Sequence, residues 1–174
     1  MKKSFFLLAS LLITVGAYSQ WSLTGNSGTS TSNFLGTTDN KPLILKVNNQ
    51  LAGFTGGPNN NNVLYGYYSF PGTVSGSGEE NTVFGSYSMV WNNQSSRNVV
   101  VGRYVMENSI TGHENVAVGH SSLGANNYPG DGNVAVGAWA LRYNSQNYNT
   151  AVGYHAAHHN TTGDGITAIG YKSL

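Results

Sequence analysis

Asn115-Val-Ala-Val-Gly119 and Asn133-Val-Ala-Val-Gly137 are two copies of a five-residue unit that recurs seven times in this chain of 174 residues. The other copies are Asn62-Val-Leu-Tyr-Gly66, Asn81-Thr-Val-Phe-Gly85, Asn98-Val-Val-Val-Gly102, Asn149-Thr-Ala-Val-Gly153 and Ile166-Thr-Ala-Ile-Gly170. Their final glycines are 19, 17, 17, 18, 16 and 17 residues apart. A regular period of this kind indicates a repeat architecture, in which each unit packs on its neighbours.

A period near 17 restricts the possible folds. Helical repeats need about 34 residues and propeller blades about 40 or more, so both are too long. Seventeen residues suffice for two short strands and two turns, which form one coil of a β-solenoid. The β-branched residues before each glycine favour strands. Residues 62–174 are therefore predicted to form an all-β, parallel β-solenoid (β-roll) of about seven coils of 16–19 residues each.

The repeat glycine and the repeat asparagine each have an expected structural role. The glycine is expected at a coil corner, where the chain bends or the backbones approach closely. The predicted corner residues are Gly66, Gly85, Gly102, Gly119, Gly137, Gly153 and Gly170. The asparagine can bond to neighbouring backbone, and stacked copies can form a side-chain ladder. These residues are Asn62, Asn81, Asn98, Asn115, Asn133 and Asn149.

Both faces of the repeat strand are apolar. In Asn115-Val-Ala-Val-Gly119 the two valines point one way and the alanine points the other way. A strand that is apolar on both sides is expected between two protein layers. One face fills the interior of the coil, and 17 residues are too few to cover the other. The pattern therefore predicts that a second chain covers the outer face.

Composition excludes several classes of protein. Asp, Glu, Lys and Arg make up only 9% of the chain, which is untypical of a coiled coil or an ordinary helical bundle. Eight basic and seven acidic residues leave no basic field for nucleic acid. The chain has no cysteine, so disulfides, cysteine-based zinc sites and thiol catalysis are excluded.

No enzyme class fits the sequence. A polysaccharide-cleaving solenoid needs paired carboxylates, and the seven acids are scattered. Hexapeptide acyltransferases need an aliphatic residue at every sixth position, and an ice-binding solenoid needs a continuous Thr ladder. Here Thr82, Thr150 and Thr167 alternate with valines at the same repeat position. The chain is predicted to be non-catalytic and to carry no cofactor.

Metal sites were weighed against ordinary surface residues. The candidate imidazoles are His113, His120, His155, His158 and His159. No carboxylate accompanies them at matching repeat positions, so we interpret them as surface side chains. The acids Glu79, Glu80, Glu114, Asp131 and Asp164 lie in the turns before the repeat strands. Calcium-binding solenoids need a Gly-Gly-x-Gly-x-Asp nonapeptide, which is absent. No metal is therefore predicted.

Residues 1–19 are interpreted as a signal peptide. Lys2 and Lys3 precede an apolar run, and Ala17 and Ser19 are the small residues that an export peptidase reads. Cleavage between Ser19 and Gln20 is predicted, with an uncleaved anchor as the alternative. No later stretch is apolar enough to span a membrane. The mature chain is expected to be exported, either secreted or associated with the cell surface or outer membrane.

Aromatic residues follow many of the repeat glycines. They are Tyr67, Tyr68, Tyr87, Tyr104, Trp139, Tyr154 and Tyr171. Stacked one coil apart, they can form a strip that holds sugars or a protein surface. The candidate ligand-facing residues are Tyr87, Tyr104, Trp139 and Tyr154. The alternative, which we favour at this stage, is that the rings pack on one another or across a subunit interface.

The Asn-x-Ala-Val-Gly-x-x-Ala-Leu unit closely resembles the head repeats of trimeric autotransporter adhesins, the YadA-like head. The resemblance covers residues 62–174 and implies a left-handed parallel β-roll that assembles as a homotrimer. The connector Asn160-Thr-Thr-Gly163 is similar to variants in tail-fibre-like exported proteins of Bacteroidetes, and residues 21–43 resemble the start of those proteins. They often end in a self-cleaving chaperone domain.

The resemblance implies an adhesin head or fibre segment that binds a glycan or protein receptor. The alternative is a passive spacer of a tail-fibre-like protein whose chaperone domain follows. Residues 20–61 are predicted to form a separate hairpin-like segment and linker, with strands at 43–47 and 51–54. Leu174 occupies the same repeat position as Leu141, so the roll is expected to continue past it.

Overall fold

A computed structural model describes residues 25–56, 61–70, 78–91, 94–126 and 128–174. The predicted signal peptide and its cleavage site lie outside these residues. The chain divides into two compact units, Met1–Gly36 and Thr37–Leu174. In the first unit, residues 25–36 form turns and bends. All nine strands of the described residues belong to the second unit, and the described residues contain no helix.

A hairpin begins the second unit. Strand β1 (Leu43–Val47) pairs antiparallel with β2 (Gln50–Thr55), as the sequence predicts. Asn48 and Asn49 join them with φ of 47° and 58°, the positive values that a tight two-residue hairpin turn requires at both positions. β2 then pairs antiparallel with β3 (Val63–Tyr65), so the hairpin and the repeats share one sheet.

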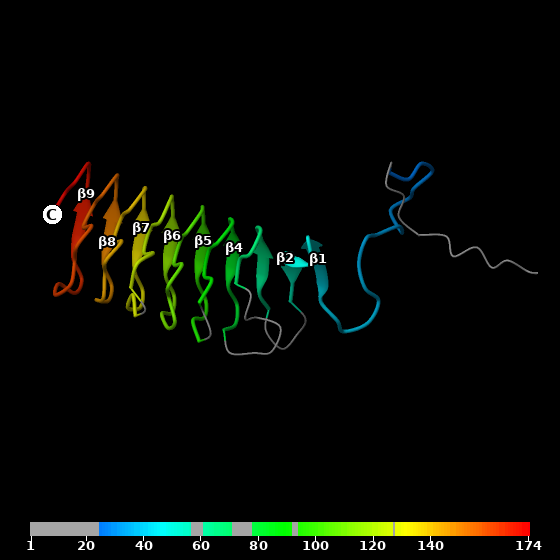
Figure 1. The fold of residues 1–174 in the computed structure, drawn as a ribbon, viewed down its shortest axis with the longest axis horizontal. Helices are drawn as coiled ribbons and strands as arrows, with labels where there is room; N and C mark the ends of the chain where they lie inside the picture. Colours follow the sequence, from blue (N-terminus) through cyan, green and yellow to red (C-terminus); the bar gives the residue numbers. More distant parts are fainter. Residues whose placement is uncertain (1–24, 57–60, 71–77, 92–93, 127) are drawn as a thin grey trace, which may run out of the picture. The chain divides into compact units, whose positions relative to one another are not determined.

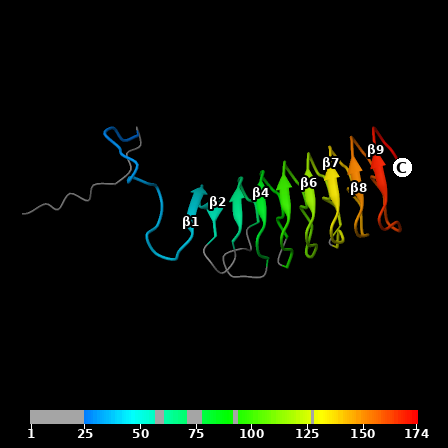
Figure 2. The ribbon, with the colours of Figure 1, turned by 180° about the vertical axis from the view of Figure 1, so that it is seen from behind.

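Each copy of the repeat supplies one short parallel strand, and the strands lie side by side in sequence order (Figures 1 and 2). After β3 come β4 (Thr82–Phe84), β5 (Val99–Val101), β6 (Val116–Val118), β7 (Val134–Val136), β8 (Thr150–Val152) and β9 (Thr167–Ile169). Equivalent repeat positions are in register; Ala117, for example, pairs with Ala135. The predicted all-β parallel solenoid is therefore confirmed.

Two columns of side chains form much of the interior. The central residue of each repeat strand is buried, from Leu64 in β3 to Ala168 in β9. The fourth residue after the repeat glycine faces it and is also buried in each coil from Phe70 to Ala157. Large residues such as Phe70 stand in the coils where the central residue is Leu or Val, and Ala157 accompanies Ala151. The side chains in these two columns therefore become smaller toward the later coils, and both columns decrease in size together.

The second strand that we expected in each coil is not formed. The segment after each repeat glycine consists of turns in which two non-glycine residues have positive φ, for example Tyr104 at 58° and Met106 at 47°. Their amides still bond between coils: Tyr104 N–H donates to Ser86 O at 3.3 Å, and Met106 N–H donates to Ser122 O at 3.2 Å. The first of these bonds reaches the preceding coil and the second reaches the following coil. A continuous strand would not close so short a coil.

The repeat asparagines form a buried ladder. The Oδ1 of Asn115 accepts a hydrogen bond from the backbone N–H of Asn133 at 2.8 Å. Its Nδ2 donates to Gly130 O at 3.0 Å, so both polar atoms bond to the following coil. Equivalent Oδ1 contacts of 2.8–3.0 Å run from Asn62 to the last asparagine, Asn149, which accepts from Ile166 N–H. The ladder satisfies backbone groups that the coil corners would otherwise bury unpaired.

Candidate binding surface

An uninterrupted column of aromatic rings runs along the coils, just after the repeat glycines. We call it the aromatic ladder and define it as Tyr67, Tyr87, Tyr104, His120, Trp139, Tyr154 and Tyr171. Successive ring centroids are 5.9, 5.5, 5.8, 6.3, 5.5 and 5.6 Å apart. These spacings are within the range of favourable aromatic contacts. The rings therefore pack on one another from coil to coil.

All four candidate ligand-facing residues of the sequence belong to the ladder. Tyr87, Tyr104 and Trp139 are partly buried, whereas Tyr154 is exposed. His120, which the sequence offered only as a candidate metal ligand, also belongs to the ladder, because its imidazole joins Tyr104 to Trp139. Its place directly after Gly119 was the available signal, because that position carries an aromatic side chain in several other coils.

Two cationic side chains lie on rings of the ladder, and a third lies on a tyrosine beside it. The guanidinium carbon of Arg103 is 4.3 Å from the ring centroid of Tyr104 and 5.7 Å from that of Tyr87. Lys172 Nζ is 5.2 Å from the Tyr171 ring. Arg142 lies 5.6 Å from the ring of Tyr143, which is in the same coil as Trp139. Such contacts are attractive because the ring face carries negative electrostatic potential.

Most of the carboxylates lie in a different part of the coil; Glu107, four residues after Arg103, is an exception. Glu79, Glu114, Asp131 and Asp164 lie in the turns that precede the repeat strands. Within the described residues the ion pair that forms, Arg97 with Glu114 at 3.0 Å, is in these turns as well. Asp131 and Asp164 accept backbone hydrogen bonds there, from His113 N–H at 2.8 Å and Asn147 N–H at 2.6 Å. Among the described residues, none of these turn acids forms an ion pair with Arg103, Arg142 or Lys172.

Three histidines gather beside the last rungs of the ladder. The rings of His155 and His158 stack with centroids 4.3 Å apart, and the Nδ1 atoms of His158 and His159 are 2.9 Å apart. Burial, and then the neighbouring His155, His159 and Arg142, lower the pKa of His158 from 6.5 to about 4. Desolvation and the charge of Lys172 lower the pKa of His155 in the same way. In this contact one Nδ1 atom donates a hydrogen bond and the other accepts it, so the accepting imidazole nitrogen carries no proton.

Lowering the pH is expected to destabilise the protein through His158. Its pKa is lowered on folding, so the unfolded chain takes up the proton first. Above pH 6.5 His158 is neutral in both the folded and the unfolded chain, so it costs no stability. As the pH falls from 6.5 toward 4, protonation of the unfolded chain lowers the free energy of unfolding progressively. Melting temperatures between pH 7.5 and 4 measure this. His158→Gln should make the decline shallower, and an unchanged slope in that variant would contradict the assignment.

The outward side of the strands forms a second distinctive surface. We call it the outer strand face; it comprises the first and third residues of the repeat strands. The first and third residues are mostly Val or Thr, with Tyr65, Phe84 and Ile169 in the third position. Tyr65 is 59% exposed, Phe84 48% and Ile169 70%. This apolar face extends over all seven repeat strands, β3 to β9.

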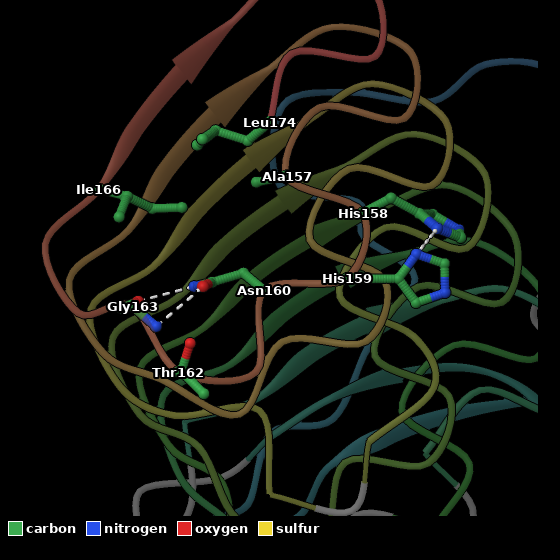
Figure 3. Close-up of a pocket in the computed structure, with 8 residues that line it drawn as sticks. All are labelled: Ala157, His158, His159, Asn160, Thr162, Gly163, Ile166 and Leu174. Atoms are coloured by element: carbon green, nitrogen blue, oxygen red, sulfur yellow. Dashed lines mark hydrogen bonds between the residues drawn. The ribbon is translucent and has the colours of Figure 1, made fainter.

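A cavity of 270 Å³ lies at the last coils (Figure 3). Ala157, Ile166 and Leu174 line it, and Ala157 is part of the interior column described above. Asn160 closes one side through hydrogen bonds with the backbone of Gly163, while the rings of His158 and His159 turn toward each other. The cavity is therefore partly lined by core residues of the last coils, and no Asp, Glu, Lys or Arg side chain is among its lining residues.

The described part of the chain has neither a metal-binding cluster nor a membrane-spanning helix. There, no group of three or more His, Asp or Glu side chains is arranged to hold a metal ion. Among the same residues, none forms a helix with the length and hydropathy of a membrane span.

Comparisons with protein-family models, curated proteins and solved structures found no match to this chain. The fold itself defines the class of protein: a parallel β-solenoid with one short strand per coil, preceded by a hairpin in the same sheet. Its two distinctive surfaces are the outer strand face and the aromatic ladder.

Proposed function

We propose that this chain is an exported attachment protein, an adhesin head or fibre segment that assembles as a homotrimer and acts by binding. The apolar outer strand face carries this proposal. It leaves aromatic and β-branched side chains such as Tyr65, Phe84 and Val101 exposed on a monomer. Contiguous apolar surfaces of this kind mark interaction sites. The resemblance of the repeat to trimeric adhesin heads supports three copies as the assembly.

The geometry of the face suits contacts between identical chains. The side chains repeat in register from β3 to β9, so copies aligned in parallel present matching rows along their whole length. Each coil contributes a small apolar contact, and the rows add together. A single coil of 16–19 residues is too short to cover its own outer strand face. Assembly would bury that face against the neighbouring copies.

Charging the outer strand face should prevent assembly. Val101 is 39% exposed on β5, near the middle of the row. In Val101→Lys, an ammonium group would lose its hydration inside an apolar interface, and we expect a monomer where the wild-type protein is a trimer. Light scattering at micromolar concentration measures the mass of each variant.

The matched control is Thr161→Lys, which adds the same charge at an exposed turn residue. It should leave the trimer intact. Circular dichroism shows whether Val101→Lys still forms the solenoid. A wild-type protein that is a stable monomer at micromolar concentration would contradict the proposed assembly.

The alternative function is a passive spacer within a tail-fibre-like protein. The mutual packing of the ladder rings favours it, because Tyr154 and Tyr171 stack with an angle of 9° between their planes, as rings in a purely structural column do. Beads coated with the trimer separate the two functions. Attachment to cells or to a glycan array supports an adhesin, and a coated bead that attaches to neither supports the spacer.

A further inference from the structure

We infer that the aromatic ladder and its cations form a binding site for acidic polysaccharide. The inference rests on the proposed attachment role and names the class of ligand. The ligand is a chain of sugars that carries carboxylate or sulfate groups and lies along the coils. Its acidic groups would bind Arg103, Arg142 and Lys172, and the apolar faces of its sugar rings would contact the ladder.

The first argument is the separation of charge around the coil. Three cations accompany the aromatic rings, and the turn acids lie before the repeat strands. Glu107 is the acid nearest in sequence to Arg103, yet the guanidinium of Arg103 donates to the Tyr104 hydroxyl at 2.7 Å rather than to that carboxylate. A guanidinium prefers carboxylate, sulfate or phosphate partners. Among the described residues, Arg103, Arg142 and Lys172 form no ion pair with a carboxylate.

The second argument is the clustering of cationic groups near the last rungs. Arg142 and Lys172 are close enough to act on the same imidazole, His155, and His158 stacks on that ring. Like charges gathered in this way raise the local positive potential. An anion bound among them would relieve the repulsion and would also favour protonation of the imidazoles.

The third argument is the combination of cations with rings. A bare cationic surface would bind any polyanion. Here Tyr154 and Tyr171, 43% and 70% exposed, stand beside the cationic group and offer rigid apolar area with hydroxyls at its edge. Sugars have apolar C–H faces, which can pack on a tyrosine ring, and polar edges, which can form hydrogen bonds with its hydroxyl. Repetition along the axis further favours a polymer over a single sugar, since successive contacts act together.

The test measures binding of the full mature protein to four probes: alginate, dextran sulfate, neutral dextran and double-stranded DNA. Calorimetry or biolayer interferometry at 50 mM salt should show binding of alginate or dextran sulfate and none of neutral dextran. Raising the salt weakens the interaction because the charges are exposed. The two anionic polysaccharides distinguish carboxylate from sulfate as the preferred group.

Variants assign the site. Arg103→Gln, Arg142→Gln and Lys172→Gln combined should weaken binding at least tenfold. The control Arg97→Gln removes a guanidinium that is paired with Glu114, in the turns away from the ladder, and should change binding less than twofold. Tyr171→Leu keeps the charge and removes an exposed ring, so it should also weaken polysaccharide binding severalfold without unfolding the protein.

Two results would overturn the inference. One is that neither anionic polysaccharide binds at 50 mM salt. The other is that DNA binds as tightly as the polysaccharides and Tyr171→Leu has no effect, which would identify a nonspecific cationic surface. The bead assay keeps the two proposals apart. Attachment that excess alginate and dextran sulfate leave unchanged overturns only the inference, whereas alginate binding without any attachment overturns only the attachment role.

Discussion

Gly137→Val is expected to abolish stable folding of the solenoid. Gly137 has φ of +133°, a region that side chains with a Cβ rarely adopt. A Cβ there would lie 2.6 Å from the carbonyl carbon of Gly153 and closer still to its oxygen. Backbone strain costs about 1–3 kcal/mol and overpacking a similar amount. The sum, roughly 2–6 kcal/mol, is a large part of the stability of an ordinary domain. Thermal and urea unfolding measure the loss.

Gly170→Ala is the informative comparison. Gly170 occupies the same repeat position, with φ of +122°, but no atom lies within 4 Å of its added Cβ. This variant therefore carries the cost of the dihedral without the clash, and we expect a loss of about 1 kcal/mol. Both variants must be compared at equal protein concentration, because assembly contributes to apparent stability. Equal losses in the two variants would show that close approach of the coils is not the cause.

Asn115→Leu is expected to have the next largest effect. The substitution nearly preserves volume but removes the acceptor for Asn133 N–H and the donor to Gly130 O. Asn115 is fully buried, so both backbone groups would remain without a partner in the interior. Each such group costs about 1–3 kcal/mol, which gives a total of roughly 2–6 kcal/mol. The midpoint of urea unfolding should fall accordingly.

Asn40→Leu serves as the control, because Asn40 is exposed and lies outside the repeats. Its midpoint should stay close to that of the wild-type protein. If Asn115→Leu unfolds at the same urea concentration as Asn40→Leu, the asparagine ladder would not be a source of stability. Amide hydrogen exchange at Asn133 provides a local reading of the same contact, since its N–H loses its acceptor in the variant.

The repeat strands and their registration could be predicted from the sequence because they depend on local pattern. Two β-branched residues, Val116 and Val118, lie between a turn residue and a glycine. Because the unit recurs about every 17 residues, each strand is expected to pair with the copies directly before and after it. The hairpin at 43–55 was equally accessible, since two asparagines between apolar runs specify a tight turn. In both cases the residues that determine the element lie within it.

The rest of the coil could not be predicted in this way. The segment from Arg103 to Met106 contains Tyr and Val, which favour strands, yet two of its residues have positive φ. Hydrogen bonds to the coils on either side stabilise this conformation. The residues within the segment do not reveal these bonds, because their partners are about 17 residues away in the sequence. The same holds for the contact of Arg103 with Tyr87: the two residues belong to successive coils, and only stacking brings the guanidinium onto that ring.

The direction of the backbone bonds between coils has a mechanical consequence. These bonds join each coil only to the one before and the one after it, as Gly119 N–H to Val101 O and Gly137 N–H to Val118 O illustrate. Tension between the two ends of the solenoid would therefore not load all of these bonds together. It would peel off the outermost coil first, and each released coil would lengthen the chain by up to roughly 55 Å, at about 3.3 Å per residue. A solenoid of this kind would therefore unfold one coil at a time under force, while the remaining coils stay folded.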